Sequence, residues 1–262
     1  MGPVEHEDTP ILETALAAAR AAGDLLTRLF GQPHRVQTKT DASIVTEADL
    51  ASERRIRELI TERFPDHTIV GEESGRTQRE SRFTWVIDPL DGTKNFLRGV
   101  PLFSVEIAVL KEGVPQVGVS YLPMMRDLLW AVRGGGALSN EGPVHVSAAD
   151  HLSRAYVSFG NLKHFERAGK LTNLMGLLDA ASQCRGIGDS WSFHLLARGS
   201  VDVFADARTA FWDIAALSVI VQEAGGAITD LEGQPMSELT VSVLATNSLL
   251  HPAALSHLRA NA

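Results

Sequence analysis

Apolar side chains recur along the first part of the chain with the spacing of amphipathic helices. The pattern covers residues 11–30 and 46–64, where an apolar position returns every three or four residues. Gly31 ends the first segment, Thr46 can cap the second, and Pro65 follows its end. The chain is therefore predicted to begin with two helices, each with one apolar face.

Short apolar runs bounded by turn residues follow these helices, as is typical of β-strands. Turn-forming sequences at residues 111–113 and 133–136 connect neighbouring runs. The pattern predicts an antiparallel meander after the two helices. Its expected strands cover residues 67–70, 84–87, 103–110, 116–121 and 127–132.

Strands and helices alternate in the second half of the chain, as is typical of βα units. We therefore expect α+β structure in residues 1–143 and α/β structure in residues 144–262, with the join near residues 142–147. The expected strands cover residues 155–159, 184–187, 201–205 and 241–245. The expected helices cover residues 165–180, 189–198 and 212–224.

Composition and charge exclude several classes of function. The formal net charge is −8, and no basic stripe occurs, so a nucleic-acid partner is not expected. Charged residues interrupt the apolar segment at 11–30, which predicts a surface helix and no membrane partner. The single cysteine, Cys184, and a first segment unlike a signal peptide favour a cytoplasmic protein.

Four acidic residues differ from the rest because each lies where an apolar strand or helix meets a turn. Carboxylates at such ends can share a cleft, where they repel one another unless a cation neutralises them. Hard oxygen ligands in an incomplete cage suit Mg²⁺, which keeps some waters and binds substrate phosphate. These candidate metal ligands are Glu72, Asp88, Asp91 and Asp213.

The segment at 88–93, Asp-Pro-Leu-Asp-Gly-Thr, combines candidate metal ligands with a candidate phosphate site. Pro89 stiffens the turn, so that both carboxylates and the Leu90 carbonyl oxygen can be directed to one place. Gly92 allows close backbone approach to an anion, and its N–H and that of Thr93 can form an anion nest.

Four segments resemble signatures of the inositol monophosphatase superfamily and occur in that family's order. Residues 88–93 resemble its DP(I/L)DGT signature, and residues 71–74 (GEES) resemble its GEE(S) element. Residues 212–216 (WDIAA), followed by EAGG at 223–226, resemble its second signature, and residues 45–49 (VTEAD) resemble its VTxAD element. The resemblance covers nearly the whole chain.

This resemblance implies a layered αβαβα sandwich of the inositol monophosphatase/fructose bisphosphatase type. It also implies a homodimer, sensitivity to Li⁺, two or three Mg²⁺ ions, and hydrolysis of a small phosphate monoester by a metal-activated water. Residues 1–143 would form a lobe that carries the metal-binding motifs. Residues 144–262 would complete the metal site and the substrate pocket.

The resemblance assigns metal ligation residue by residue. It implies that Glu72, Asp88 and the Leu90 carbonyl oxygen hold one ion. It implies that Asp88, Asp91 and Asp213 hold a second ion, and that a third, weaker ion binds near Glu72.

The resemblance also assigns roles in catalysis and in binding of the phosphate group. Asp49 and Thr93 would orient the attacking water, and Glu72 would act in catalysis beside its ion. The backbone N–H groups of Gly92 and Thr93 would hold the phosphate. Asp49 could instead be an ordinary acid in the first turn of a helix.

Two further positions are expected to contact the leaving group. One is Asp206, and the other is the Gly188-Asp189 turn, which Trp191 follows. An acid after this glycine is typical of histidinol-phosphate phosphatases of the superfamily, which residues 39–43 also resemble. Two carboxylates and an aromatic ring suit the ammonium and imidazole of histidinol, so we expect L-histidinol phosphate as the substrate.

Alternatives remain open at this end of the site. Asp189 could only cap its helix, and Asp206 is one methylene shorter than the glutamate expected there. The alternative function is an inositol-1-phosphate phosphatase or a loosely selective member of the group. A regulatory interaction protein is a further alternative, which intact metal ligands disfavour.

Overall fold

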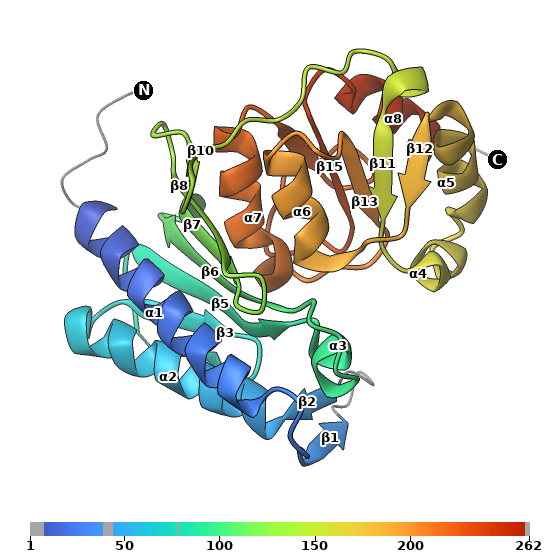
Figure 1. Cartoon of the computed structure of the whole chain (residues 1–262). Coiled ribbons are helices and arrows are strands. Elements are labelled where there is room, and N and C mark those ends of the chain that lie inside the picture. The colour runs from blue at the N-terminus through green and yellow to red at the C-terminus, as the bar shows by residue number, and fades with distance from the viewer. Residues whose placement is uncertain (1–7, 39–43, 78, 260–262) are drawn as a thin grey trace.

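The computed structural model describes residues 8–38, 44–77 and 79–259, which form a layered αβαβα sandwich (Figure 1). This confirms the predicted fold class. None of the helices in this part of the chain is both long and apolar enough to cross a membrane.

Helices form three of the layers. Helices α1 and α2 cover one face of the large sheet, α6 and α7 lie between the two sheets, and α4, α5 and α8 cover the outer face of the smaller sheet. The helices are α1 (Asp8–Leu29), α2 (Glu47–Arg63), α3 (Thr93–Leu97), α4 (Leu162–Arg167), α5 (Leu171–Ala180), α6 (Asp189–Ala197), α7 (Phe211–Glu223) and α8 (His251–Arg259), with a 3-10 turn at Leu152–Arg154.

The large sheet has eight strands in the order β10-β9-β8-β7-β6-β5-β3-β4. The predicted meander is confirmed from β5 onward, but β3 pairs parallel to β5, so an antiparallel start is wrong. The connection at residues 72–82 is long enough to bring the chain back alongside. The strands are β3 (Thr68–Gly71), β4 (Gly75–Arg76), β5 (Phe83–Asp91), β6 (Ser104–Lys111), β7 (Val114–Leu122), β8 (Asp127–Val132), β9 (Ala137–Ser139) and β10 (Gly142–Pro143).

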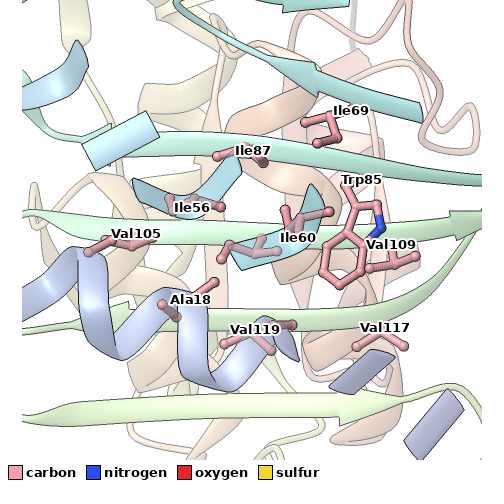
Figure 2. Packing of buried hydrophobic residues seen from close by; sticks show 14 of the residues in the cluster. Ala18, Ile56, Ile60, Ile69, Trp85, Ile87, Val105, Val109, Val117 and Val119 are labelled. Carbon is pink, nitrogen blue, oxygen red and sulfur yellow. The ribbon is translucent and has the colours of Figure 1, made fainter. Parts of the chain in front are cut away.

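Side chains alternate between the two faces of this sheet, and both faces are buried. Trp85 and Ile87 meet Ile56 and Ile60 of α2 on one face, as Figure 2 shows. Val86 points to the other face and joins a cluster beneath α7. The sheet is therefore held rigidly between two helical layers at the point where β5 reaches the acidic residues.

Helix α7 approaches the sheet closely because β7 carries a glycine. A Cβ atom at Gly118 would lie 2.2 Å from the Ala216 carbonyl oxygen. Any larger residue would displace α7, which carries Asp213 in its first turn.

The smaller sheet is mixed, with the order β12-β11-β13-β15-β14. β11 pairs parallel to β12 and β13, as βα units predict, but β15 runs antiparallel to both β13 and β14. Its strands are β11 (Tyr156–Phe159), β12 (Gln183–Arg185), β13 (Val203–Asp206), β14 (Ala227–Thr229) and β15 (Val243–Thr246). A two-stranded antiparallel ribbon of β1 (Val36–Thr38) and β2 (Ile44–Thr46) lies outside both sheets.

The single helix predicted over residues 165–180 is wrong. Two helices, α4 and α5, occupy this region, because Gly169 between them has a left-handed backbone with φ +67°. The short helix α3, the C-terminal helix α8 and strand β14 were not predicted. Residues 39–43, which supported the histidinol-phosphate resemblance, lie outside the described residues.

The division into lobes at residues 143 and 144 stays a prediction. The large sheet ends with β10 at Pro143, and the smaller sheet starts with β11. Helix α7 comes from the second half of the chain but packs on β6 and β7 of the first. The two halves therefore share the middle helical layer.

Candidate active site

Acidic residues from four elements meet in a cleft between the two sheets. Asp91 ends β5, Asp189 begins α6, Asp206 ends β13, and Asp213 lies in the first turn of α7. The cleft is lined by Asp91, Asp189, Ser190, Phe193, Phe204, Asp206, Arg208, Thr209, Asp213, Ile214, Leu217 and Val243. The structure thus brings together acids from both predicted groups, the metal ligands and the leaving-group residues.

Asp88 is the most deeply buried of the four predicted acidic ligands, with 2% of its surface exposed. Burial raises the pKa of its carboxyl well above the usual range, and the charges of Glu72, Asp91 and Asp213 raise it further. The four predicted acids therefore lie near enough to repel one another.

The turn after Asp88 is fixed by local hydrogen bonds. The Leu90 backbone N–H donates to Asp88 Oδ1 at 3.0 Å. Ser52 Oγ of α2 donates to the Pro89 carbonyl oxygen at 2.8 Å. The regular pairing of β5 with β6 is interrupted between Asp88 and Asp91. This interruption leaves the segment between them out of the sheet ladder.

Gly92 occupies a position that other residues could not easily take. Its φ is +86°, and a Cβ atom would lie 2.9 Å from the Leu102 carbonyl oxygen. Thr93 then starts α3, so the backbone N–H groups of this first turn are left without partners from the helix itself. This arrangement can accept the oxygens of a phosphate group.

Thr93 and Asp49, which were predicted to orient the water, are in direct contact. Thr93 Oγ1 lies 3.0 Å from Asp49 Oδ1 and 3.2 Å from the Leu90 carbonyl oxygen. Asp49 Oδ2 accepts the Thr46 backbone N–H at 2.8 Å, so Asp49 also closes the capping box of α2. Burial raises the pKa of Asp49, partly offset by these hydrogen bonds.

The turn that carries Glu72 is supported by Glu53, a residue that the sequence analysis missed. Glu53 is fully buried in α2, and its carboxylate accepts the backbone N–H groups of Glu73 at 2.8 Å and Ser74 at 3.1 Å. Arg57, one helical turn later, donates to it at 2.7 Å. The four-residue spacing of Glu53 and Arg57 was the only visible signal, and it is common on solvated helix faces.

Asp213 both stabilises the first turn of α7 and faces the other acids. Its Oδ2 accepts the Ala210 backbone N–H at 2.8 Å and lies 3.2 Å from Thr209 Oγ1. Burial raises the pKa of Asp213 to about 7, with contributions from the charges of Asp91 and Glu72. Asp213 therefore stabilises the start of α7 and still leaves a repelled carboxylate in the cleft.

The chemistry of these donors fits a hard divalent cation. No group of three or more His, Cys, Asp or Glu side chains within residues 8–38, 44–77 and 79–259 is gathered closely enough to hold a metal as it stands. The predicted site, however, includes the Leu90 carbonyl oxygen, and its acids raise one another's pKa values. A cation would remove that repulsion, and carboxylate and carbonyl oxygens are the donors that Mg²⁺ prefers.

Asp189 does not cap its own helix, so the capping alternative is wrong. Gly188 is the N-cap of α6, and no side chain caps that end. The Asp189 carboxylate instead accepts a hydrogen bond from Asn95 Nδ2 of α3 at 3.0 Å. Loss of hydration in the cleft, followed by the charges of Asp91 and Asp206, raises the pKa of Asp189 to about 7, although the residue as a whole is exposed at the rim.

Asn95 was also missed by the sequence analysis. Its amide donates to Asp189 and, at 2.8 Å, to the Leu102 carbonyl oxygen, so both of its N–H groups are used. It therefore connects α3, which follows the metal-binding turn, to the first residue of α6. Its position two residues after Thr93 gave no sign of a partner so distant in sequence.

The Asp206 carboxylate is hydrogen-bonded to neighbouring groups from the second half of the chain. Its Oδ1 accepts the Arg208 backbone N–H at 3.1 Å and lies 3.1 Å from His164 Nδ1. Burial raises the pKa of Asp206 despite these donors. Asp189 is therefore the cleft acid with the greater freedom to meet a ligand.

The fold and the acid cluster define the class of protein, a phosphatase with the layered sandwich of the inositol monophosphatase and fructose bisphosphatase type. The chain belongs to the inositol monophosphatase family, whose model matches residues 7–262.

The chain is similar in sequence or structure to family members that carry different names. The chain is 39% identical to a histidinol-phosphatase from Mycobacterium tuberculosis, over 98% of this chain and 100% of that protein. It resembles the structure of the extragenic suppressor protein suhB from Bartonella henselae with a TM-score of 0.91 and 30% identity, covering 97% and 100% of the two chains. It also resembles a Thermotoga maritima IMPase with a TM-score of 0.86 and 31% identity, covering 95% and 97%.

Proposed function

We propose that the protein hydrolyses L-histidinol phosphate to L-histidinol and phosphate in a Mg²⁺-dependent reaction. The observation that carries this proposal is the position of Asp189, an acid that lines the cleft together with Asp91 and Asp206. A cationic leaving group would meet its carboxylate there. A full-length relative with the name histidinol-phosphatase supports the same choice.

In this proposal the metal ligands are those that the family resemblance assigned. Glu72, Asp88 and the Leu90 carbonyl oxygen would hold one Mg²⁺, and Asp91 and Asp213 would complete a second site with Asp88. Mg²⁺ supplies charge neutralisation at the phosphoryl oxygens and activation of water. The mutual repulsion of these acids supports their assignment, because a bound cation would relieve it.

The remaining roles fall to groups of this chain. Thr93 and Asp49, 3.0 Å apart, would hold the attacking water and receive its proton, with Glu72 acting beside them. The backbone N–H groups of Gly92 and Thr93 would hold the phosphate group. Water would attack the phosphorus directly as the P–O bond to the leaving group breaks, and the departing alkoxide would take a proton from solvent water, without a covalent phosphoenzyme.

Selectivity would come from the leaving-group end of the cleft. An ammonium at the Asp189 carboxylate forms a charge-assisted hydrogen bond that contributes about 1.5–3 kcal/mol. Trp191, two residues after Asp189, lines a small hollow together with Gly188 and Asp189, so its ring would lie near a bound leaving group. Asp206 would add negative potential and position the His164 side chain.

An inositol-1-phosphate phosphatase is the second candidate. The commitment of Asp206 to His164 and Arg208 favours it, because only one free acid then remains for a cationic leaving group. The homodimer and the sensitivity to Li⁺ implied by the resemblance stay predictions, and so does the cytoplasmic location.

A phosphate-release panel tests the proposal. The enzyme would be stripped with EDTA and given L-histidinol phosphate, inositol 1-phosphate, a simple alkyl phosphate or fructose 1,6-bisphosphate, with and without Mg²⁺. We expect turnover only with Mg²⁺ and the highest kcat/KM with L-histidinol phosphate. Equal turnover in EDTA would overturn the metal mechanism, and a higher kcat/KM for inositol 1-phosphate would favour the second candidate.

A further inference from the structure

Helix α6, which begins with Asp189, presents a polar stripe to the large sheet. Ser190, His194 and Arg198 recur every four residues and lie on one side of the helix. Each reaches a polar group of the large sheet. Apolar packing alone would leave such a helix some freedom to rotate, whereas directed hydrogen bonds do not.

The first contact of the stripe is with a predicted metal ligand. Ser190 Oγ donates to Asp91 Oδ2 at 2.6 Å, and the Ser190 backbone N–H donates to the same oxygen at 3.2 Å. Asp189 precedes Ser190 directly, so the position of Asp189 relative to the metal-binding turn depends on where α6 sits.

The second contact is a buried chain of hydrogen-bonded polar groups on the face of the large sheet that α6 covers. Ser120 Oγ of β7 lies 2.7 Å from Glu106 Oε1 of β6 and 2.7 Å from His194 Nε2. His194 Nδ1 lies 2.9 Å from Asp127 Oδ2, and Arg198 also binds Asp127. Glu106, Ser120 and His194 are each 0% exposed.

The proton count in this chain allows two arrangements. If Ser120 donates to Glu106, both nitrogens of His194 must carry protons to reach Ser120 and Asp127, which places an imidazolium and a carboxylate in the interior. If Glu106 is a neutral acid that donates to Ser120, then Ser120 donates to Nε2 and a neutral His194 donates from Nδ1 to Asp127. The second arrangement avoids two buried charges.

Two observations favour the neutral arrangement. Glu106 Oε2 has no hydrogen-bond partner among the described atoms, which would be costly for a charged carboxylate. Burial also lowers the pKa of His194, which disfavours the imidazolium that the first arrangement needs. In the neutral arrangement every donor has one acceptor. The hydrogen bonds then run in one direction, from Glu106 through Ser120 and His194 to Asp127.

We propose that Glu106, Ser120 and His194 are positioning residues that hold α6 on the large sheet and thereby set the selectivity of Asp189 for a cationic leaving group. They do not reach the cleft in the way that Asp189 does, since none of the three lines it. This inference rests on the proposed function, because it assumes that Asp189 meets the substrate.

The experiment interrupts the series of hydrogen bonds at Ser120, its smallest side chain. Ser120→Ala removes the hydroxyl between Glu106 and His194 with little change in volume. Ser218→Ala is the matched control, because Ser218 is 3% exposed and donates only within α7, to the Ala215 carbonyl oxygen at 2.7 Å. For each variant we would measure kcat/KM for L-histidinol phosphate and inositol 1-phosphate, together with the melting temperature.

We expect Ser120→Ala to lower the selectivity ratio, kcat/KM for L-histidinol phosphate divided by kcat/KM for inositol 1-phosphate, by about tenfold. A small misplacement of a binding group has a large kinetic effect. Ser218→Ala should leave the ratio unchanged at a similar loss of stability. In an Asp189→Asn background, Ser120→Ala should lower the ratio no further. Glu106→Gln, which keeps a neutral donor in place, should retain the wild-type ratio.

Two results separate this inference from the proposed function. A high wild-type ratio that Ser120→Ala leaves unchanged, or an additive effect with Asp189→Asn, contradicts the positioning role alone. A wild-type ratio at or below one contradicts the substrate proposal and overturns this inference with it.

Discussion

The two ends of the cleft are built in different ways. At the metal end, three of the five assigned ligands come from the single segment at 88–93, and a β-sheet buried on both faces holds them. At the leaving-group end, Asp189 is placed by Asn95 from another helix and by a hydrogen-bonded chain from the large sheet. Local sequence specifies the first end, and tertiary contacts specify the second.

This difference predicts that mutations at the metal end stop the reaction, whereas mutations at the leaving-group end change the choice of substrate. The largest effect is expected for Asp88→Asn, because Asp88 is assigned to both ions. We expect kcat to fall by about 10³-fold or more, since loss of metal charge stabilisation costs several kcal/mol. Phosphate release with saturating Mg²⁺ measures this.

The same variant should be more stable than the wild type in EDTA, because it removes a buried carboxylate whose pKa is raised by its neighbours. The exposed Asp150→Asn is a suitable control, as it should change neither property. A variant that kept wild-type turnover would remove Asp88 from the metal site.

Thr93→Ala should have the next largest effect. Its hydroxyl touches Asp49 and the Leu90 carbonyl oxygen, and loss of general-base assistance typically costs about 10²–10⁴-fold in kcat. Thr93→Ser keeps the hydroxyl and should retain most of the activity. Combining Thr93→Ala with Asp49→Asn should cost less than the product of the two single losses. A phosphorylated side chain trapped by quenching would contradict direct attack by water.

Asp189→Asn should act on selectivity. The change keeps the shape and the contact with Asn95 but removes the charge, so kcat/KM for L-histidinol phosphate should fall about 10–150-fold. Turnover of inositol 1-phosphate should change much less. Asp206→Asn should have a smaller effect, because internal donors already occupy that carboxylate. Equal losses on both substrates would show that Asp189 does not meet the ammonium.

The smallest effect concerns stability without metal. The pKa of Asp213 is about 7 in the folded protein against an ordinary value of 3.8, so between these pH values the folded state binds more protons than the unfolded state. The free energy of unfolding contributed by Asp213 is therefore fully present below about pH 4 and falls as the pH rises to about 7. It should level off at higher pH.

Thermal melts in EDTA from pH 5 to pH 8 would measure this effect. Relative to Asp213→Asn, the wild type should lose a few degrees of melting temperature over that range, at about 2–4 °C for each kcal/mol. Saturating Mg²⁺ should cancel the loss. A difference between the two proteins that stays constant with pH would mean that Asp213 is not repelled by the cluster.

The comparison of the two ends also explains what could be predicted from the sequence. The segment at 88–93 and the cap of α2 at Thr46 depend on neighbouring residues, so their structure was predictable. The parallel pairing of β3 with β5 and the break at Gly169 depend on how distant strands and helices pack. Glu53 and Asn95 looked like ordinary polar residues of helices, because their partners are brought near only by folding.

A one-pot competition tests the central claim most directly. L-histidinol phosphate and inositol 1-phosphate would be mixed at equal low concentrations with the wild-type enzyme and Mg²⁺, and both alcohol products would be quantified over time. Under these conditions the product ratio equals the ratio of the kcat/KM values. We predict that histidinol exceeds inositol by about tenfold or more. Equal amounts, or an excess of inositol, would contradict the account of Asp189 as the residue that selects the substrate.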